Sequence, residues 1–310
     1  MSQPTDRLTL LATFARIAER GSISAAARDL GLSQASASRQ LAALEQRIGA
    51  PLITRTTHDL SLTEAGRACL VDARSLLSAW EALAERFDEA RDAPLRGRIR
   101  VVAPVALGQR ALARSAADFL ATHPGVSLSW LLDDRPVRMA ELGADLWIKI
   151  GEVTDDTLVV RSLGRVERLV VSTPALFGTG RPSDPTALAD VPMVAVEPFE
   201  GTRVQLVDHA GREAPVAARA VFSTDNIVAA RTAVFAGAGW AVLPRWFVDA
   251  ELLAGRLIDA LPAWRAPKLT LNAALLPVGR RPRRVNTFAE HVAKEVMAIP
   301  GVLPPDVGEH

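Results

Sequence analysis

The sequence predicts an α/β multidomain protein with three parts: an N-terminal winged helix-turn-helix, a long linker helix, and a C-terminal α/β region of two lobes. Three patterns support this prediction. Residues 1–62 show short helical segments separated by glycines, residues 63–92 show apolar residues at heptad spacing, and the remainder alternates between strand and helix patterns. A chain of 310 residues is long enough for two or three compact domains.

Two short helices are predicted first. Leu10 and Phe14 belong to an apolar stripe at helical spacing, and Gly21 stands where a helix C-terminus favours a left-handed residue. Ser24 is the expected N-cap of the second helix, which stops at Gly31.

The third helix is expected to follow its N-cap, Ser33, and to end at Gly49. Its inward stripe is formed by Ala37, Leu41, Leu44 and Ile48. Together with the glycine-containing turn before it, this helix completes a helix-turn-helix pattern. The β-prone segment "PLITRTTHDLSL" that follows predicts a small two-stranded wing.

The outward face of the third helix carries small and polar residues that suit contact with DNA. A recognition helix needs small side chains for close approach to the major groove, and Gln, Ser and Arg to contact bases and phosphates. The candidates are Ser33, Gln34, Ser36, Ser38 and Arg39. An ordinary solvated face is the alternative, but acidic residues are absent from residues 33–44, which is unusual for a surface helix.

The wing adds two further candidates for DNA contact, Arg55 and His58. An Arg at this position is expected to lie over the adjacent minor groove, where its charge is favoured. His58 taken alone is more typical of a plain surface histidine.

A long helix is predicted from Thr63, whose hydroxyl is the expected N-cap. Its heptad seam consists of Cys69, Ala73, Leu76, Trp80, Leu83, Phe87 and Ala90. We expect this helix to stand away from the globular part and to pair with its copy in a second subunit. Leu76, Trp80, Leu83 and Phe87 are the candidate dimerisation residues. A helix docked on its own domain is the alternative.

The C-terminal part alternates between strands and helices, which predicts mostly parallel sheets with helices on their faces. An extended segment at residues 158–171 is long enough to cross from one lobe to the other, and the last strand and helix are expected to return to the first lobe. The predicted boundaries are 1–62 for the winged helix-turn-helix, 63–92 for the linker helix, 93–97 for a hinge, 98–165 with 268–300 for lobe I, 166–267 for lobe II, and 301–310 for a tail.

Composition limits the classes of function. The net charge of +1 argues against a polybasic surface, and a single cysteine, Cys69, excludes an intramolecular disulfide and a cysteine-based metal cluster. The N-terminal residues lack the pattern of an export leader, and the longest apolar run, residues 227–243, contains Arg231 and two glycines. We therefore expect a cytoplasmic protein with no contact to a membrane, no metal and no cofactor.

An enzyme is not expected. The sequence contains no Gly-x-Ser-x-Gly motif, no phosphate-binding loop and no metal-ligand spacing, and its five histidines are scattered over different elements. A pure solute-binding protein is a second alternative, disfavoured by the missing leader and by some 90 leading residues that such a protein does not need.

The segment "FARIAERGSISAAARDLGLSQASASRQLAALEQRIGAPLITRTTHDLSLTEAG", residues 14–66, resembles the LysR-type transcriptional regulators. The matches are Gly21, Ser22, Ala26, Ala27, Leu30, Ser33, Ser38, Arg39, Leu44, Glu45, Gly49, Leu52, Arg55, Thr63 and Gly66. "GADLWIKIG", "GAGWAVLP" and "LAGRL" are similar to landmarks of the family's C-terminal part, so the resemblance spans nearly the whole chain. Two positions depart from the family pattern: Ala35, where Pro is common, and Ile53, where Phe is usual.

This resemblance implies a DNA-binding regulator with a two-lobed effector domain like a periplasmic binding protein. It implies a homodimer or homotetramer on an interrupted dyad of double-stranded operator DNA, with a small-molecule effector between the lobes that alters DNA bending. RNA polymerase is a further expected partner, and the bacterial nucleoid the expected location. The alternative is a cytoplasmic small-molecule-binding protein without regulatory DNA binding.

The resemblance places the effector against the helix start in "APVALG", where backbone N–H groups favour an anion. The candidate effector residues are Pro104, Val105, Ala106, Lys149, Thr173, Glu197, Phe199, Thr202, Thr224 and Leu243. Three of them have alternative interpretations. Thr173 and Thr224 are equally well placed to cap helices, and Lys149 suits either an acidic effector or an ion pair with Asp145.

Overall fold

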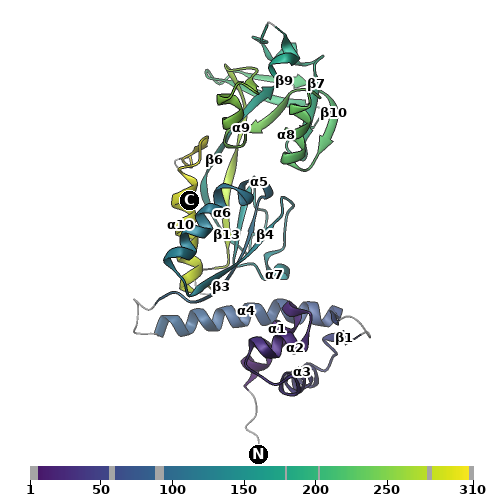
Figure 1. Cartoon of the computed structure of the whole chain (residues 1–310), viewed down its shortest axis with the longest axis vertical. Coiled ribbons are helices and arrows are strands. Elements are labelled where there is room, and N and C mark those ends of the chain that lie inside the picture. Colours follow the sequence, from purple (N-terminus) through teal and green to yellow (C-terminus); the bar gives the residue numbers. More distant parts are fainter. Residues whose placement is uncertain are drawn as a thin grey trace, which may run out of the picture.

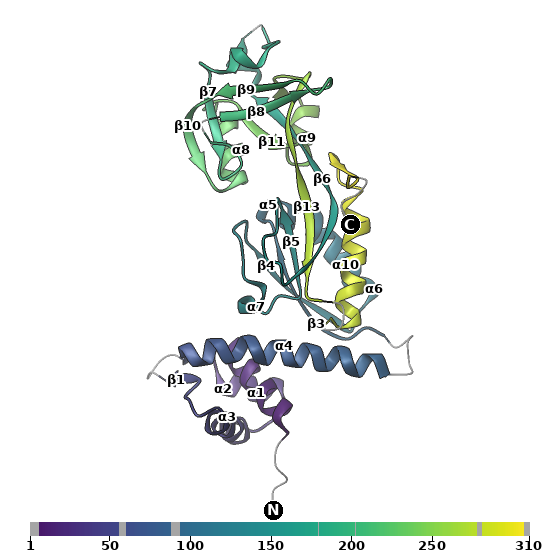
Figure 2. The same ribbon diagram turned by 180° about the vertical axis from the view of Figure 1, so that it is seen from behind.

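A computed structural model describes residues 6–55, 60–87, 94–178, 180–201, 203–277 and 281–306. Along the longest axis lie, in order, a small helical domain, the long helix α4 (Glu64–Phe87), a first α/β lobe and a second α/β lobe (Figure 1). The strands β6 (Val159–Ser172) and β13 (Trp264–Leu275) run side by side through both lobes (Figure 2).

The N-terminal domain is a winged helix-turn-helix, as predicted. It consists of α1 (Arg7–Arg20), α2 (Ile23–Asp29), α3 (Gln34–Ile48), β1 (Ile53–Arg55) and β2 (Leu60–Leu62). One apolar cluster, which includes the buried side chains of Leu10, Phe14 and Leu41, packs the three helices together. The wing strands pair antiparallel, with Ile53 opposite Leu62.

Two details of this domain differ from the prediction. The N-cap of α2 is Ser22 and not Ser24: the Oγ of Ser22 accepts a hydrogen bond from the N–H of Ala25 at 3.3 Å. Ile48 was expected on the inward stripe of α3, yet it is 49% exposed. It is the last residue of α3, one turn beyond Leu44, where the burial of this face ends.

Helix α4 begins as predicted, because the Oγ1 of Thr63 accepts a hydrogen bond from the N–H of Gly66 at 2.8 Å. The expectation that this helix stands away from the globular parts is wrong. Ala73 on one face is fully buried, and Nη1 of Arg74 donates a hydrogen bond to the carbonyl oxygen of Glu141 in lobe I at 3.3 Å. The helix therefore lies between the N-terminal domain and lobe I (Figure 1).

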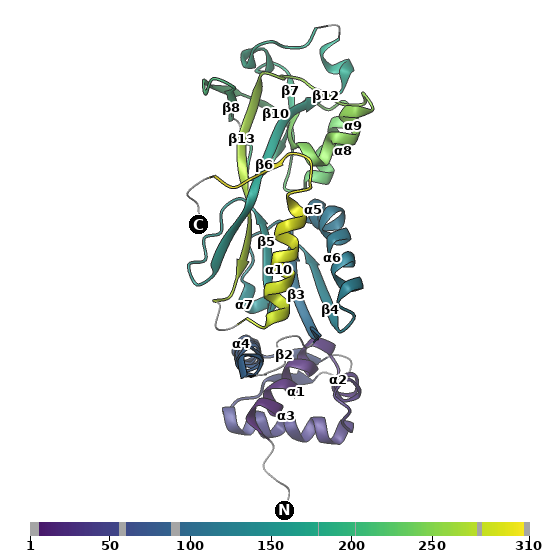
Figure 3. The same cartoon turned by 90° about the vertical axis from the view of Figure 1, so that its left-hand side faces the viewer.

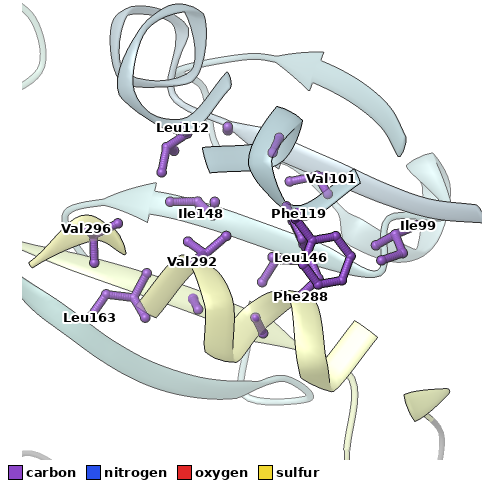
Figure 4. Close-up of a cluster of buried hydrophobic side chains, with 14 of the residues drawn as sticks. Ile99, Val101, Leu112, Phe119, Leu146, Ile148, Leu163, Phe288, Val292 and Val296 are labelled. Carbon is purple, nitrogen blue, oxygen red and sulfur yellow. The ribbon is translucent and has the colours of Figure 1, made fainter. Parts of the chain in front are cut away.

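Lobe I contains β3 (Gly97–Ala103), α5 (Val105–Gln109), α6 (Ala111–Thr122), β4 (Val126–Leu132), α7 (Met139–Leu142), β5 (Leu146–Ile150) and α10 (Arg283–Val296). Strands β5, β3 and β4 are parallel neighbours in that order. Helices α6 and α10 lie side by side (Figure 3), and the rings of Phe119 and Phe288 meet 5.0 Å apart in the core beneath them (Figure 4). The segment between β3 and β4 forms two helices, α5 and α6, because the backbone departs from helical geometry at Arg110.

Lobe II contains the short 3₁₀ helices η1 (Pro174–Phe177) and η2 (Pro185–Leu188), the helices α8 (Ile227–Phe235) and α9 (Arg245–Leu253), and the strands β7 (Pro192–Val196), β8 (Arg203–Asp208), β9 (Glu213–Ala217), β10 (Arg219–Thr224), β11 (Ala241–Pro244) and β12 (Ile258–Asp259). Strands β7 and β10 pair in parallel, and the chain between them forms the antiparallel pair β8 and β9. Two apolar clusters hold this lobe together, and the side chain of Trp240 is completely buried in one of them.

The chain returns to lobe I through β13, which runs antiparallel to both β5 and β6. The main sheet is therefore mixed rather than mostly parallel. The second crossover strand, β13, returns from lobe II to lobe I and so runs in the opposite direction to the first crossover strand, β6. The last short strand, β14 (Val302–Leu303), also pairs antiparallel with β6. Within the described ranges, no helix has the length and apolar character needed to cross a bilayer.

Candidate DNA interface and interlobe cavity

The N-terminal turn of α3 presents a cluster of small polar side chains. The Oγ of Ser33 accepts a hydrogen bond from the N–H of Ser36 at 3.1 Å and lies 2.9 Å from the Ser36 hydroxyl. The guanidinium of Arg39, one turn further along, donates to the same hydroxyl at 3.3 Å. Gln34 is exposed beside them, and Ser38 is half-buried. Four of these predicted residues thus share one exposed end of the helix.

Helix α3 is held in place by its opposite face and by Glu45. Ala37 and Leu41 are buried in the domain core, so the polar face points outward. The Oε1 of Glu45 accepts hydrogen bonds from the N–H groups of Leu52 at 2.8 Å and Ile53 at 3.3 Å. These bonds connect the recognition helix to the first strand of the wing. The orientation of helix α3 is therefore coupled to the orientation of the wing.

The wing residues are only partly described. Arg55 ends β1, and its backbone pairs with Leu60 of β2. The Arg55 side chain and residues 56–59, which include the predicted contact His58, lie outside the described part of the chain.

Four large apolar side chains on α4 remain exposed. Leu76, Trp80, Leu83 and Phe87 are 55%, 53%, 36% and 78% exposed. They lie on the predicted heptad seam, whereas Ala73 of the same seam is buried. The two interpretations of this helix therefore apply to two different lengths of one seam: at Ala73 the seam is covered by the chain itself, and from Leu76 to Phe87 it is an uncovered apolar stripe.

A cavity of about 520 Å³ lies between the two lobes. Lobe I contributes the start of α5 and the segments that follow β4 and β5, because the carboxyl ends of parallel strands meet at one edge of a sheet. Lobe II contributes the segment after β7 and the residues before α8. The crossover strands add Arg168 and Leu269.

Six of the predicted effector residues line this cavity: Pro104, Val105, Ala106, Lys149, Glu197 and Phe199. Leu243 does not, because its side chain is buried in a core cluster of lobe II. Its strand neighbours Val242 and Pro244 line the cavity instead. Successive side chains of a strand point to opposite faces. A prediction that is one residue off along the strand therefore selects Leu243, on the core side, in place of Val242 or Pro244 at the cavity.

Thr173 and Thr224 also lie outside the cavity lining, and Thr202 falls outside the described residues. Thr224 is not the N-cap of α8. That position is taken by Asn226, whose Oδ1 accepts hydrogen bonds from two helix N–H groups at 3.0 Å. Thr173 occupies the N-cap position of η1, but its side chain makes no capping hydrogen bond.

The start of α5 is occupied by a carboxylate of the chain itself. The Oδ1 of Asp134 accepts a hydrogen bond from the N–H of Val105 at 3.0 Å, and Nζ of Lys149 donates to the Asp134 carbonyl oxygen at 3.0 Å. Burial raises the pKa of Asp134 and lowers the pKa of Lys149. Lys149 does not pair with Asp145, whose carboxylate accepts instead from the N–H of Arg100 at 2.7 Å.

A buried ion pair fixes the segment after β7. Arg168 on β6 donates one hydrogen bond to the carboxylate of Glu200 and another to the carbonyl oxygen of Pro267 at 2.8 Å. Burial raises the pKa of Glu200 to about 7, although Arg168 opposes this shift. The pair holds the segment that carries Glu197 and Phe199 against both crossover strands.

The polar and aromatic lining residues that the sequence did not predict are Asp133, Asp134, Arg135, Glu152, Arg168, Glu200, Asp225, Asn226 and Trp246. A usable signal was present for three of them. The polar run "DDR" directly follows the β-prone segment "VSLSWLL", which forms β4, at the same sheet edge as "APVALG". Arg168 and Trp246 carry no such signal, because only the folded crossovers bring them to the cavity. In the described part of the chain, no three His, Cys, Asp or Glu side chains are grouped to hold a metal ion.

Comparison with known families agrees with this geometry. Residues 8–67 match the model of the bacterial regulatory helix-turn-helix proteins of the lysR family, and residues 92–297 match the LysR substrate binding domain. The chain belongs to the LysR family of transcriptional regulators. This LysR-type regulator thus combines an N-terminal DNA-binding domain with a C-terminal effector-binding domain, in a family of transcription factors rather than enzymes.

Similar regulators match over most of their length. The HTH-type transcriptional regulator YhjC of Escherichia coli K12 is 31% identical over 295 residues, which cover 93% of this LysR-type chain and 97% of that protein. PtxR of Pseudomonas aeruginosa is 29% identical, with 93% of each chain covered. Two full-length structures share the fold: a single-residue variant of OxyR from Pseudomonas aeruginosa (TM-score 0.71, 17% identity, 97% of each chain) and AphB of Vibrio cholerae (TM-score 0.58, 23% identity, 93% of this chain and 99% of that one).

Proposed function

We propose that this regulator binds an interrupted dyad operator through α3 and the wing of paired subunits, and that a small molecule in the interlobe cavity controls this binding. The observation that carries the proposal is the exposed, acid-free face of α3 around Ser36 and Arg39. This helix is anchored by its buried face, so its polar N-terminal end is free to enter the major groove.

The second part of the proposal concerns assembly. The uncovered stripe of α4, formed by Leu76, Trp80, Leu83 and Phe87, is an apolar surface that a second copy of α4 would cover. Pairing places two α3 helices on one duplex and doubles the number of basic side chains that face DNA. Such a dimer, or a tetramer of two dimers, is the form that a dyad operator requires.

The third part concerns control. A molecule that contacts both lobes favours the arrangement in which all of its contacts are made, and so shifts the orientation of one lobe relative to the other. Lobe I touches α4 and α1, so a change of orientation reaches the DNA-binding domains and alters the bend of the operator. We propose that the regulator acts in this way on chromosomal DNA in the cytoplasm, where RNA polymerase is the machinery that responds.

The test begins with DNA affinity purification of genomic fragments by the full-length protein, which identifies the bound sites. Fluorescence anisotropy on one such site then compares the wild type with Arg39→Ala. We expect Arg39→Ala to weaken binding about tenfold to a hundredfold, the usual effect of losing an Arg contact to a base. Arg114→Ala is the matched control, because it removes an exposed arginine from α6 of lobe I.

Specific binding that survives Arg39→Ala unchanged would refute the assignment of this face. A protein that enriches no genomic site, while it still binds small molecules, would favour the alternative of a small-molecule-binding protein without regulatory DNA binding.

A further inference from the structure

The charges of the interlobe cavity indicate which kind of molecule it accepts. Six carboxylate side chains line the cavity, against three basic ones. A cavity with apolar walls concentrates the field of the charges around it, so this excess of carboxylates repels anions and attracts cations.

Two of the three basic side chains already form ion pairs with carboxylates of the same chain. Arg135 donates two hydrogen bonds to the carboxylate of Asp133, at 3.0 and 2.9 Å. Arg168 is paired with Glu200, and both side chains are buried. Neither arginine is available to an anionic ligand without the loss of an existing ion pair.

The third basic group, Lys149, faces Asp134. Its Nζ donates to the backbone carbonyl of Asp134, while the Asp134 carboxylate accepts the N–H of Val105 at the start of α5. That N–H is the group that the sequence analysis assigned to an anionic effector. The chain supplies its own carboxylate there, so the anion position is filled.

Two further carboxylates remain unused. Glu197 and Asp225 lie on lobe II and are exposed at the cavity, and neither forms an ion pair or a side-chain hydrogen bond with another described residue. Asp225 lies close enough to Asp134 of lobe I to raise the pKa of that residue. Carboxylates from the two lobes therefore lie close to each other at the cavity, and the basic groups beside them, Lys149 and Arg135, already interact with Asp134 and Asp133.

The remaining walls suit an apolar or aromatic body. Phe199, from lobe II, is 41% exposed and reaches across to lobe I, where a Cβ added at Gly151 would lie 3.6 Å from its ring. Trp246 and Ile227 add further apolar surface. Aromatic faces bind organic cations well, because the negative face of the ring attracts the positive charge.

We propose that the effector of this regulator is an organic cation: an apolar or aromatic body that carries an ammonium or amidinium group, held between Glu197 and Asp225 of lobe II and Asp134 of lobe I. This inference rests on the proposed function, since it names the ligand class of the proposed effector site. A cation that bridges the facing carboxylates draws the two lobes together, whereas a carboxylate ligand meets uncompensated negative charge.

Isothermal titration calorimetry on the full-length protein tests the charge preference with matched probes. Tryptamine is compared with indolepropionate, and phenethylamine with phenylpropionate, because each pair shares its ring and chain and differs only in the charged group. We expect the amines to bind and the carboxylates not to bind.

Two cavity variants and one control assign the binding to this site. Glu197→Gln combined with Asp225→Asn is expected to weaken amine binding about tenfold or more, as charged partners are lost. Glu197→Lys combined with Asp225→Lys is expected to reverse the preference toward the carboxylates. Glu290→Gln removes an exposed carboxylate on α10, outside the cavity lining, and is expected to leave binding unchanged.

Binding of the carboxylates in preference to the amines overturns the proposal, and so does a failure of both classes, or amine binding that the cavity variants do not affect. Operator binding, measured on the same preparations, separates this outcome from a failure of the proposed function. A protein that retains its operator and prefers carboxylates remains an effector-controlled regulator with a different ligand class. Circular dichroism spectra establish that the variants are folded.

Discussion

The ion pair of Arg168 and Glu200 shows how one residue pair links the cavity to the frame of the protein. Both side chains are buried, at 8% and 4% exposure, and together they attach the Phe199 segment to the crossover strands. Removing two charges from water is costly, and this cost is the main cause of the raised pKa of Glu200.

The pKa of Glu200 predicts a specific pH dependence of stability. The pKa is about 7 in the folded protein, against an ordinary value of 4.5, so folding takes up a proton between these values and stability falls as pH rises through this range. We expect Glu200→Gln to remove this slope, which amounts to about 1–3 kcal/mol of unfolding free energy between about pH 5 and pH 8. Urea denaturation of the wild type and the variant across this range measures it.

The variant retains an amide that can still accept from Arg168, so the folded structure is expected to persist. Glu290→Gln controls for the loss of a carboxylate elsewhere. Parallel pH profiles for the wild type and Glu200→Gln would contradict the prediction.

At the scale of single residues, the sequence placed most of the exposed polar residues of α3 and six of the ten cavity candidates, but it missed most of the charged residues of the cavity. Ser33 and Arg39 were assigned from helical periodicity, because a helix turns every residue by a fixed angle. Leu243 was misplaced because it lies one position from Val242 on a short strand. Strand ends carry no sequence signal strong enough to fix their phase.

At the scale of elements, α4 performs two tasks along one apolar seam. The seam is buried within the chain at Ala73, and the stripe from Leu76 to Phe87 is left uncovered. Heptad spacing predicted the stripe. It did not predict the docking, because a pattern of apolar positions does not specify which of two neighbouring surfaces covers each position.

The exposed stripe predicts a change of oligomeric state. Leu76→Glu combined with Leu83→Glu puts two charges into the proposed pairing surface, where their desolvation is unfavourable. We expect the molar mass in light scattering to fall about twofold, from tetramer to dimer or from dimer to monomer. Ala68→Glu introduces a charge at an exposed position of the same helix outside the stripe, and is expected to leave the mass unchanged. An unchanged mass in the double variant would count against the stripe as the interface.

At the scale of the whole molecule, Glu19 joins the DNA-binding domain to lobe I. This carboxylate at the end of α1 pairs with Arg100, with Arg98 at 3.6 Å and with Arg74 at 3.9 Å, and its side chain is only 11% exposed. Three elements that are distant in sequence, α1, α4 and β3, therefore converge on one charge, beside a cavity of about 380 Å³.

Glu19→Gln is expected to weaken this connection. Loss of the carboxylate leaves three arginines close together, at a cost of about 1–3 kcal/mol once their partial exposure to solvent is considered. Differential scanning calorimetry is expected to show the N-terminal domain unfolding at a lower temperature than the effector lobes. Asp72→Asn, at an exposed carboxylate of α4, is the control. A thermogram identical to that of the wild type would show that Glu19 does not couple the domains.

The sequence by itself determined the order of the parts, the outward face of α3, the apolar stripe of α4 and the return of the last strand and helix to lobe I. These features follow from periodicities of helices and strands and from capping residues, which are local properties of the chain. The tertiary structure alone decided the docking of α4, the mixed sheet, and the charge balance of the interlobe cavity. Asp134 and Asp225 are far apart in sequence and come from different lobes, so their common cavity depends on how β6 and β13 place those lobes. Long-range electrostatics of this kind arises only when separate elements are packed together, and here it favours a cation where local sequence suggested an anion.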